Sequence, residues 1–200
     1  NASTGLKEID YIIGDQYVTP LENKNQFTEN ILQLPNIWSC LSKPAFKIKK
    51  ENSSPALKNR FITFGSFNNL SKINDNVIGI WSEILKRIEN SKLFLKTKEL
   101  DNLKMVENIR KKFQKNGIGA EKIITEGRSK TREEMLKKYN QIDIALDPFP
   151  YSGITTSFES IWMGVPLYVL KGNNFYSRTG ISINKNLGME DWIANNKKDY

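Results

Sequence analysis

Residues 143–166, with the sequence DIALDPFPYSGITTSFESIWMGVP, contain the side chains best suited to bind an anion. An apolar run ends at Asp147, and Gly153 then allows a tight turn into a helix that opens at Thr155 or Thr156. The first amides of a helix have no partner within it, and two hydroxyl groups stand beside them here. We therefore expect this turn to bind a phosphate group.

Glu159 follows one turn into the same helix. A carboxylate at this place can accept hydrogen bonds from two vicinal ribose hydroxyls, as an acidic residue does in dinucleotide-binding folds. The alternative interpretation is structural: the threonines form an ordinary helix cap, and Glu159 interacts favourably with the helix dipole.

A second polar loop, GSFNNLSK at residues 65–72, directly follows a short β-rich run. Asn68, Asn69 and Lys72 would lie just beyond the end of that strand, where polar groups can meet a diphosphate. The ammonium group of Lys72 is a movable point charge suited to phosphate oxygens. The alternative is a lysine that is simply solvated.

A third loop, RSKTR at residues 128–132, is basic and precedes a helix with a capping-box pattern. Arg128, Lys130 and Arg132 can contact phosphate there, or backbone groups of the loop can hold a nucleotide base. An exposed basic loop without a ligand is the alternative, and the same pair of interpretations applies to Lys96.

Several kinds of site are excluded by what the sequence lacks. It contains no histidine, so a Ser-His-Asp triad, an HExxH metal site or a histidine base cannot form within it. No group of carboxylates has the spacing of metal ligands, so we expect no metal site and no cofactor. The glycine-rich GxGxxG and P-loop patterns are also absent, which argues against NAD-type and kinase-type sites.

The 200 residues carry a net charge of +8 and a pI near 9.4. This charge fits either a well-solvated surface or a field that attracts anions such as nucleotide phosphates. No nucleic-acid-binding motif is present, and no apolar run is long enough to span a membrane, so neither partner is expected. The single cysteine cannot form an internal disulfide, which favours a reducing compartment and a cytoplasmic location.

From residue 60 onward, short apolar runs alternate with segments of helical periodicity, a pattern typical of a parallel sheet covered on both faces. Predicted strands lie at 61–67, 92–97, 122–125, 142–147 and 166–170, and predicted helices at 75–89, 102–116, 131–140 and 155–163. We therefore predict an α/β, Rossmann-like domain over residues 60–200.

The first 59 residues differ from this pattern. A strand near residues 9–13, a polar helix near 23–33 and a proline-containing connector are expected there. We interpret residues 1–45 as the end of another lobe with its connector, and residues 46–59 as a linker. The chain begins like the middle of a domain and is expected to be a fragment of a longer protein.

The blocks FGSFNNLSK (64–72) and DIALDPFPYSGITTSFESIWMGVP (143–166) resemble glycosyltransferase family 41, which comprises O-linked N-acetylglucosamine transferases and SPINDLY-like proteins. The pattern is long, ordered and correctly spaced, and the resemblance covers most of the chain. It implies a GT-B fold, in which two Rossmann-like domains enclose a sugar nucleotide. This chain would then be the C-terminal, nucleotide-sugar-binding domain with the tail of the N-terminal catalytic domain.

The resemblance also implies an activity, namely transfer of N-acetylglucosamine from UDP-N-acetylglucosamine to serine or threonine hydroxyls of a protein. Transfer in this family inverts the sugar and needs no metal, and most members carry tetratricopeptide repeats upstream. The implied partners are a nucleotide-sugar donor and an acceptor protein or peptide. Alternatives within the same fold are transfer of fucose from GDP-fucose, transfer of glucose from UDP-glucose to asparagine, and a degenerate protein-binding module.

By the resemblance, Lys72 is the catalytic residue that neutralises the departing diphosphate. The residues that match donor-binding positions of the family are Asn69, Lys72, Lys130, Arg132, Gly153, Thr155, Thr156 and Glu159. Among them, Lys130 and Arg132 fall where the family holds uracil. Met135 and Ile154 depart from the family, because many members have a histidine at the first position and animal members have one at the second.

Overall fold

The computed structural model describes residues 3–51 and 53–200. Its main body is a six-stranded parallel sheet in the order β5-β4-β3-β6-β7-β8. The strands are β3 (Ile62–Ser66), β4 (Ser91–Lys96), β5 (Ile123–Glu126), β6 (Ile144–Leu146), β7 (Leu167–Leu170) and β8 (Ile193–Ala194). The predicted α/β fold with a parallel sheet is therefore confirmed.

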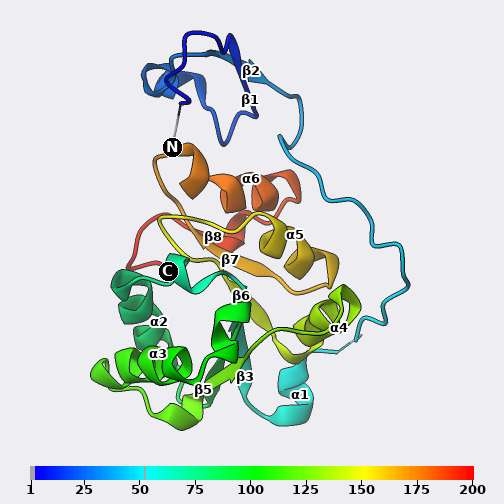
Figure 1. Ribbon diagram of the computed structural model, residues 1–200, viewed down its shortest axis with the longest axis vertical. Coiled ribbons are helices and arrows are strands. Elements are labelled where there is room, and N and C mark those ends of the chain that lie inside the picture. The colour runs from blue at the N-terminus through cyan, green and yellow to red at the C-terminus, as the bar shows by residue number, and fades with distance from the viewer. Residues whose placement is uncertain (1–2, 52) are drawn as a thin grey trace.

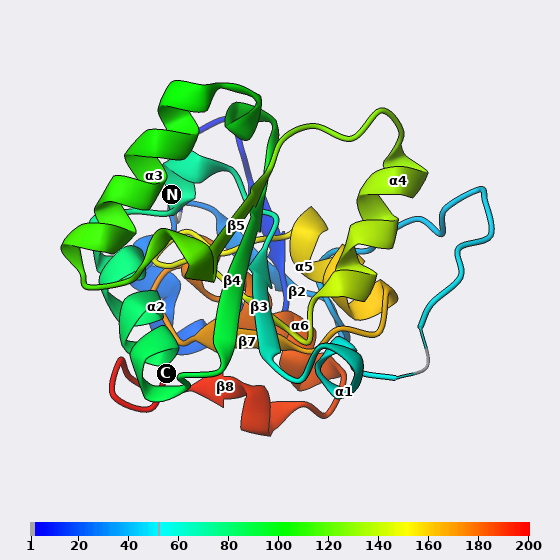
Figure 2. The same cartoon turned by 90° about the horizontal axis from the view of Figure 1, so that it is seen from below.

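Helices cover both faces of this sheet (Figure 2). On one side lie α2 (Asp75–Arg87) and α3 (Leu103–Lys115), and on the other lie α4 (Arg132–Lys137), α5 (Thr155–Trp162) and α6 (Thr179–Asn186). Alternate side chains of strand β4 pack against the helices on opposite faces of the sheet. Leu93 and Leu95 pack into the core beneath α2 and α3, whereas Phe94 points into the core beneath α4 and α6.

Helix α2 illustrates why these segments are helical. The side chain of Asn74 caps its first turn by accepting a hydrogen bond from the Val77 amide at 3.1 Å. Val77, Trp81 and Leu85 then recur on one face and are almost completely buried. Burying each such side chain contributes about 1.5–3 kcal/mol, so packing against the sheet rather than intrinsic propensity fixes this helix.

The first part of the chain contains a second, two-stranded parallel sheet, formed by β1 (Tyr11–Gly14) and β2 (Asn30–Gln33). The predicted helix at 23–33 is wrong, because the structure has a short 3-10 helix, η1 (Leu21–Gln26), followed by strand β2. Pairing between β1 and β2 determines the conformation of residues 30–33. Tyr11 lies opposite Asn30 in register, and these tertiary contacts override the weak helical preference of the polar residues.

An irregular segment joins β2 to the main sheet along the outside of the molecule (Figure 1). The described residues between 34 and 54 form no helix or strand, and α1 (Pro55–Asn59) then begins after the cap Ser54. The predicted linker at 46–59 thus contains this short helix. Residues 1, 2 and 52 belong to predicted segments but lie outside the described residues, and the division at 45 and 59 stays a prediction.

The end of the chain adds elements that the sequence did not reveal, above all α6 and β8. The first six residues of α6, from Thr179 to Asn184, are all buried. A helix buried all round shows no alternation of apolar and polar faces, so its sequence lacks the usual periodicity. Among the residues that the structure describes, no helix is long and apolar enough to cross a membrane.

Candidate functional site

The strand order places a crevice between β3 and β6. Successive strands after β3 are added on one side of it, whereas β6, β7 and β8 extend the sheet on the other side. The loops that leave β3 and β6 therefore diverge at their carboxyl ends, which is where ligands bind in open α/β sheets. Lys72 follows β3, and the segment from Asp147 to Gly153 follows β6, so both polar loops predicted from the sequence meet at this crevice.

Helix α5 begins at this crevice without a polar cap. Its N-cap residue is Ile154, whose hydrocarbon side chain cannot accept a hydrogen bond. By contrast, Ser54, Asn74, Asn102 and Thr131 each accept a hydrogen bond from the first turn of α1, α2, α3 and α4, and α6, which also lacks a side-chain cap, begins at buried residues. The first turn of α5 therefore keeps amide donors and the positive end of the helix dipole available to an anion.

Lys72 lies against the turn that precedes α5. Its Nζ donates a hydrogen bond to the carbonyl oxygen of Ser152 at 2.9 Å and lies 4.6 Å from the ring centroid of Tyr151. Partial burial lowers the pKa of the Lys72 ammonium, and the charge of Asp147 opposes that shift. These contacts hold a cation beside the open end of α5.

The paired threonines occupy different environments. Thr155 is exposed, whereas the Thr156 hydroxyl donates a hydrogen bond to Oδ1 of Asn68 at 3.1 Å and so ties α5 to the loop after β3. Gly153 lies so close to α5 that a Cβ atom there would collide with the hydroxyl of Ser157 and lie 2.7 Å from that of Thr156. Glycine at this position thus lets the turn approach the helix start.

A pocket of about 390 Å³ lies where α4 and α5 meet the ends of β3, β4 and β5. Four predicted site residues line it, and Phe67 and Met135 supply its apolar surface. The predicted residues in its wall are Lys130, Arg132, Thr156 and Glu159. This combination of apolar side chains with a few converging polar groups is typical of small-molecule sites.

Glu159 is a buried carboxylate in the wall of this pocket, with 4% of its surface exposed. Nη2 of Arg132 lies 3.4 Å from its Oε1, so a residue of α4 reaches across to α5. Burial raises the pKa of Glu159, and the adjacent Arg132 guanidinium opposes the shift. A carboxylate in this position can accept hydrogen bonds from ligand hydroxyls.

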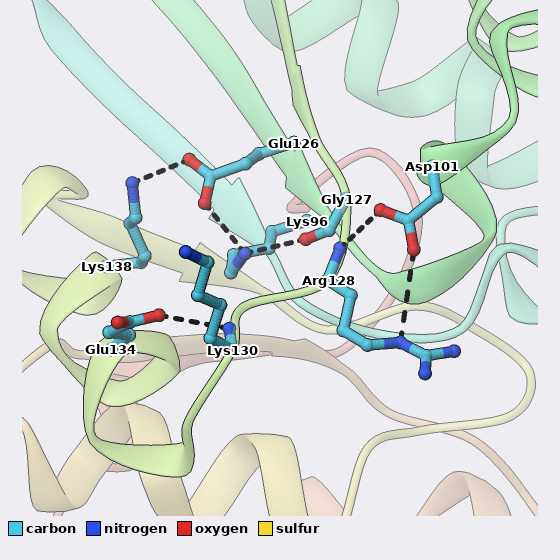
Figure 3. A network of polar contacts seen from close by, with 8 residues as sticks. All are labelled: Lys96, Asp101, Glu126, Gly127, Arg128, Lys130, Glu134 and Lys138. Carbon is cyan, nitrogen blue, oxygen red and sulfur yellow. Dashed lines mark hydrogen bonds and ion pairs between the residues drawn. The ribbon is translucent and has the colours of Figure 1, made fainter.

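The basic loop between β5 and α4 is held by ion pairs and backbone contacts (Figure 3). Nζ of the buried Lys96 lies 2.8 Å from Oε1 of Glu126 and 2.7 Å from the carbonyl oxygen of Gly127, and Lys138 contacts the other carboxylate oxygen. Lys96 is thus engaged in holding this loop. The interpretation of Lys96 as a free anion ligand does not fit its partners.

Two backbone contacts fix the rest of that loop. The amide of Arg128 donates to Oδ1 of Asp101 at 2.8 Å, and the amide of Lys130 donates to Oε2 of Glu134 at 3.0 Å. The side chains of Arg128, Lys130 and Arg132 remain largely exposed. The loop therefore presents cationic side chains from a fixed backbone.

The predicted residues form two adjoining groups. Lys72, Gly153 and Thr155 belong to the turn at the start of α5, and Thr156 joins this turn to the pocket. Asn69 stands apart, because its amide donates to Oε1 of Glu99 at 2.7 Å and its Oδ1 accepts from the Ser71 amide. The buried Asn68, rather than Asn69, contacts the α5 side of the crevice.

Sequence reasoning missed the role of Asp147 in holding this turn. Asp147 is 1% exposed, and its Oδ1 accepts hydrogen bonds from the Gly153 amide at 2.8 Å and from the Ser157 hydroxyl at 3.3 Å. Its position directly after an apolar strand was the available signal, since polar groups at strand ends face the crevice. Among the described residues, no group of three or more His, Cys, Asp or Glu side chains is placed to hold a metal ion.

Comparison with known proteins decides the family. The sequence model of glycosyl transferase family 41 matches residues 44–200. The chain belongs to this family. Relatives named probable UDP-N-acetylglucosamine–peptide N-acetylglucosaminyltransferase SPINDLY are 35% identical in Eustoma exaltatum subsp. russellianum and 33% identical in Arabidopsis thaliana. Each match covers 99% of the chain but 22% of the relative, so the chain spans about a fifth of their length.

A solved structure agrees with this assignment to glycosyl transferase family 41. A lysine-to-methionine mutant of the O-GlcNAc transferase of Thermobaculum terrenum is similar over 100% of the chain and 37% of its own length. The TM-score is 0.92 and the sequence identity 28%. The similarity confirms the predicted GT-B-type fold.

Proposed function

We propose that this chain carries the donor-binding part of a glycosyltransferase that transfers N-acetylglucosamine from UDP-N-acetylglucosamine to serine or threonine hydroxyls of proteins. The observation that carries the proposal is the open start of α5 beside the Lys72 ammonium, at the crevice of a family 41 sheet. Its relatives and the similar solved structure bear names of this activity. The donor and a protein acceptor are accordingly the proposed partners, and the cytoplasm the proposed location.

Within the proposed reaction, an acceptor hydroxyl loses its proton to solvent, and its oxygen attacks the anomeric carbon of the sugar from the side opposite the diphosphate, which inverts that carbon. The bond from the anomeric carbon to the phosphate oxygen breaks, and its electron pair remains on that oxygen. Negative charge therefore develops on the diphosphate, and fixed donors aimed there stabilise the transition state. Lys72 and the first amides of α5 are these donors.

The neighbouring pocket would hold the nucleoside. Glu159 lies one turn beyond the open start of α5, where its carboxylate can accept hydrogen bonds from ribose hydroxyls. Phe67 and Met135 offer apolar surface to a base, and the fixed backbone of residues 127–130 offers polar groups to its edge. Charge neutralisation by Lys72 and the amides of α5 also supports the proposed transfer without a metal.

Calorimetric titration of the chain with UDP, GDP and UDP-N-acetylglucosamine, without added metal, tests the proposal. We expect the two uridine ligands to bind and GDP to bind much more weakly. Thr156→Val should weaken UDP binding severalfold, because it removes the hydroxyl that lines the pocket and ties α5 to Asn68. Thr28→Val, at an exposed threonine of the N-terminal segment, is the matched control and should leave the affinity unchanged.

The other outcomes are equally informative. Binding of GDP alone would replace the proposed donor by a guanosine diphosphate sugar such as GDP-fucose. Loss of UDP binding in the presence of EDTA would contradict metal independence. No nucleotide binding by the folded chain would contradict a donor site altogether and would favour a protein-binding module.

A further inference from the structure

We propose that Asp147 positions the turn that receives the donor's diphosphate and takes up a proton when that anion binds. The inference rests on the proposed function and adds to it a residue that does not itself contact the donor. Three observations carry it: the contacts of one carboxylate oxygen, the isolation of the other among the described residues, and the charge of Lys72, which acts on the carboxylate.

The first oxygen of Asp147 holds the phosphate-binding turn. Oδ1 accepts from the amide of Gly153 at 2.8 Å and from the hydroxyl of Ser157 at 3.3 Å, so it ties the turn to the first turn of α5. The carbonyl oxygen of Gly153 accepts in turn from the Thr179 hydroxyl at 2.9 Å. Asp147 therefore fixes the backbone at the start of α5, and the diphosphate would bind to the amides of that same backbone.

The second oxygen is isolated. Oδ2 is buried and has no hydrogen-bond partner among the described residues. It lies against the start of α6, where a Cβ atom on Gly180 would be 2.7 Å from it. A proton placed on Oδ2 would remove a buried charge without breaking any hydrogen bond that Oδ1 accepts.

Among the residues that the structure describes, two titratable groups act on this carboxylate. Lys72 acts on it from the loop after β3, and Tyr200 approaches from the end of the chain, where its hydroxyl donates to the Asp147 carbonyl oxygen at 3.2 Å. From α5 and α6 it meets Ser157 and Gly180, which do not titrate. Burial raises the pKa of Asp147 to about 7, although the Gly153 amide and the Lys72 charge oppose the shift.

A bound diphosphate would raise the pKa of Asp147. Its negative charge competes with Asp147 for Lys72 and repels the carboxylate, so it favours the protonated form. For a pKa that rises by one unit from about 7, linkage requires uptake of about half a proton per donor bound at pH 7.5. Donor binding should accordingly strengthen as the pH falls from 8 to 6.

The test is calorimetric titration of UDP-N-acetylglucosamine into the chain at pH 7.5, in HEPES and in Tris, whose ionisation enthalpies differ and neither of which contains phosphate. The diphosphate of this ligand is a diester that does not titrate near pH 7, so proton uptake reports on the protein. We expect uptake of about half a proton for the wild type. It should vanish in Asp147→Asn, whose side-chain carbonyl can still accept from Gly153.

Comparison of variants distinguishes the positioning role of the Asp147 side chain from the effect of its charge. Asp147→Ala removes the acceptor and should weaken donor binding tenfold or more, whereas Asp147→Asn should change it less than threefold at pH 7.5. Asp143→Asn is the matched control, because Asp143 lies at the other end of the same strand, where it accepts from the Thr63 amide at 2.8 Å. It should keep the full proton uptake. Thermal unfolding of each variant verifies that it is folded.

The possible failures are distinguishable. Donor binding without proton uptake, or with the same uptake in Asp147→Asn, overturns the role of Asp147 and leaves the proposed function standing. Uptake that persists in Asp147→Asn would belong to a group other than Asp147. No donor binding by the folded wild type would overturn both proposals.

Discussion

The starts of α4 and α5 contribute to the same pocket, and they are built in opposite ways. At α4, the Thr131 hydroxyl accepts from the Glu134 amide at 3.1 Å, and the Glu134 carboxylate accepts from the Lys130 amide at 3.0 Å. At α5, Ile154 offers no acceptor. A helix start that is satisfied by its own side chains stabilises the fold, whereas one left open keeps its donors for a ligand.

The cations beside the two helix starts differ as well. Lys72 is half-buried against Tyr151 and the turn before α5, whereas Lys130 and Arg132 are exposed at the start of α4. An ammonium held in partly desolvated surroundings acts on a nearby anion more strongly than a solvated one. Under the proposed function, charge stabilisation would belong to Lys72 and the start of α5, and contact with the nucleoside to the pocket between α4 and Glu159 of α5.

The largest effect that we expect is that of Lys72→Ala. Removing one fixed donor to a developing negative charge lowers turnover by about 10²–10³-fold. UDP binding should fall much less, because the amides of α5 remain. Steady-state kinetics of the full-length protein, with UDP titrations beside them, check this, and equal losses in turnover and binding would count against a transition-state role.

Adding an N-cap acceptor to α5 should have the next largest effect, in this case on UDP affinity. In Ile154→Asp, the new carboxylate would accept from the first amides of α5 and repel phosphate, so we expect UDP affinity to fall about tenfold. Ile154→Ala provides the control, since it supplies neither a cap nor a charge and should bind UDP within threefold of wild type. Unchanged UDP affinity in Ile154→Asp would mean that these amides do not hold the phosphates.

Glu159→Gln should affect binding and stability in opposite directions. Burial raises the pKa of Glu159 in the folded chain above its ordinary value of 4.5, so ionisation destabilises the fold increasingly as the pH rises from 4.5 to the folded pKa, and by a constant amount above it. The variant should therefore unfold at a higher temperature than wild type at pH 8, with a difference that shrinks toward pH 4.5. UDP affinity should fall severalfold, and a variant that binds UDP as tightly as wild type would contradict the ribose contact.

The smallest effect on binding should follow removal of the cap that α4 has. Thr131→Ala should lower the free energy of unfolding by about 1 kcal/mol, which shifts the thermal midpoint by about 2–4 °C in a chain of this size. UDP affinity should stay within threefold. A large loss of UDP binding with unchanged stability would mean that the start of α4, rather than that of α5, contacts the ligand.

Much of this arrangement could be predicted from the sequence, because it depends on local patterns. Alternating strands and helices predicted the parallel sheet, and the turn at Gly153 predicted a helix that opens at Thr155 or Thr156, of which Thr155 is the observed start. Strand β2 and helix α6 were missed because pairing with β1 and burial on all sides, rather than periodicity, determine them. Asn69 and Asp147 show the same limit, since only the folded chain reveals that Glu99 engages the first and Gly153 the second.

The central claim is that the open start of α5 binds the diphosphate. Its most direct test is to follow the backbone amide signals of the chain by nuclear magnetic resonance during a titration with UDP. The account predicts that the largest shifts occur at the amides of Thr155, Thr156 and Ser157, with smaller ones at the capped start of α4. Shifts confined to α4 and the loop before it, with the α5 amides unmoved, would contradict the account.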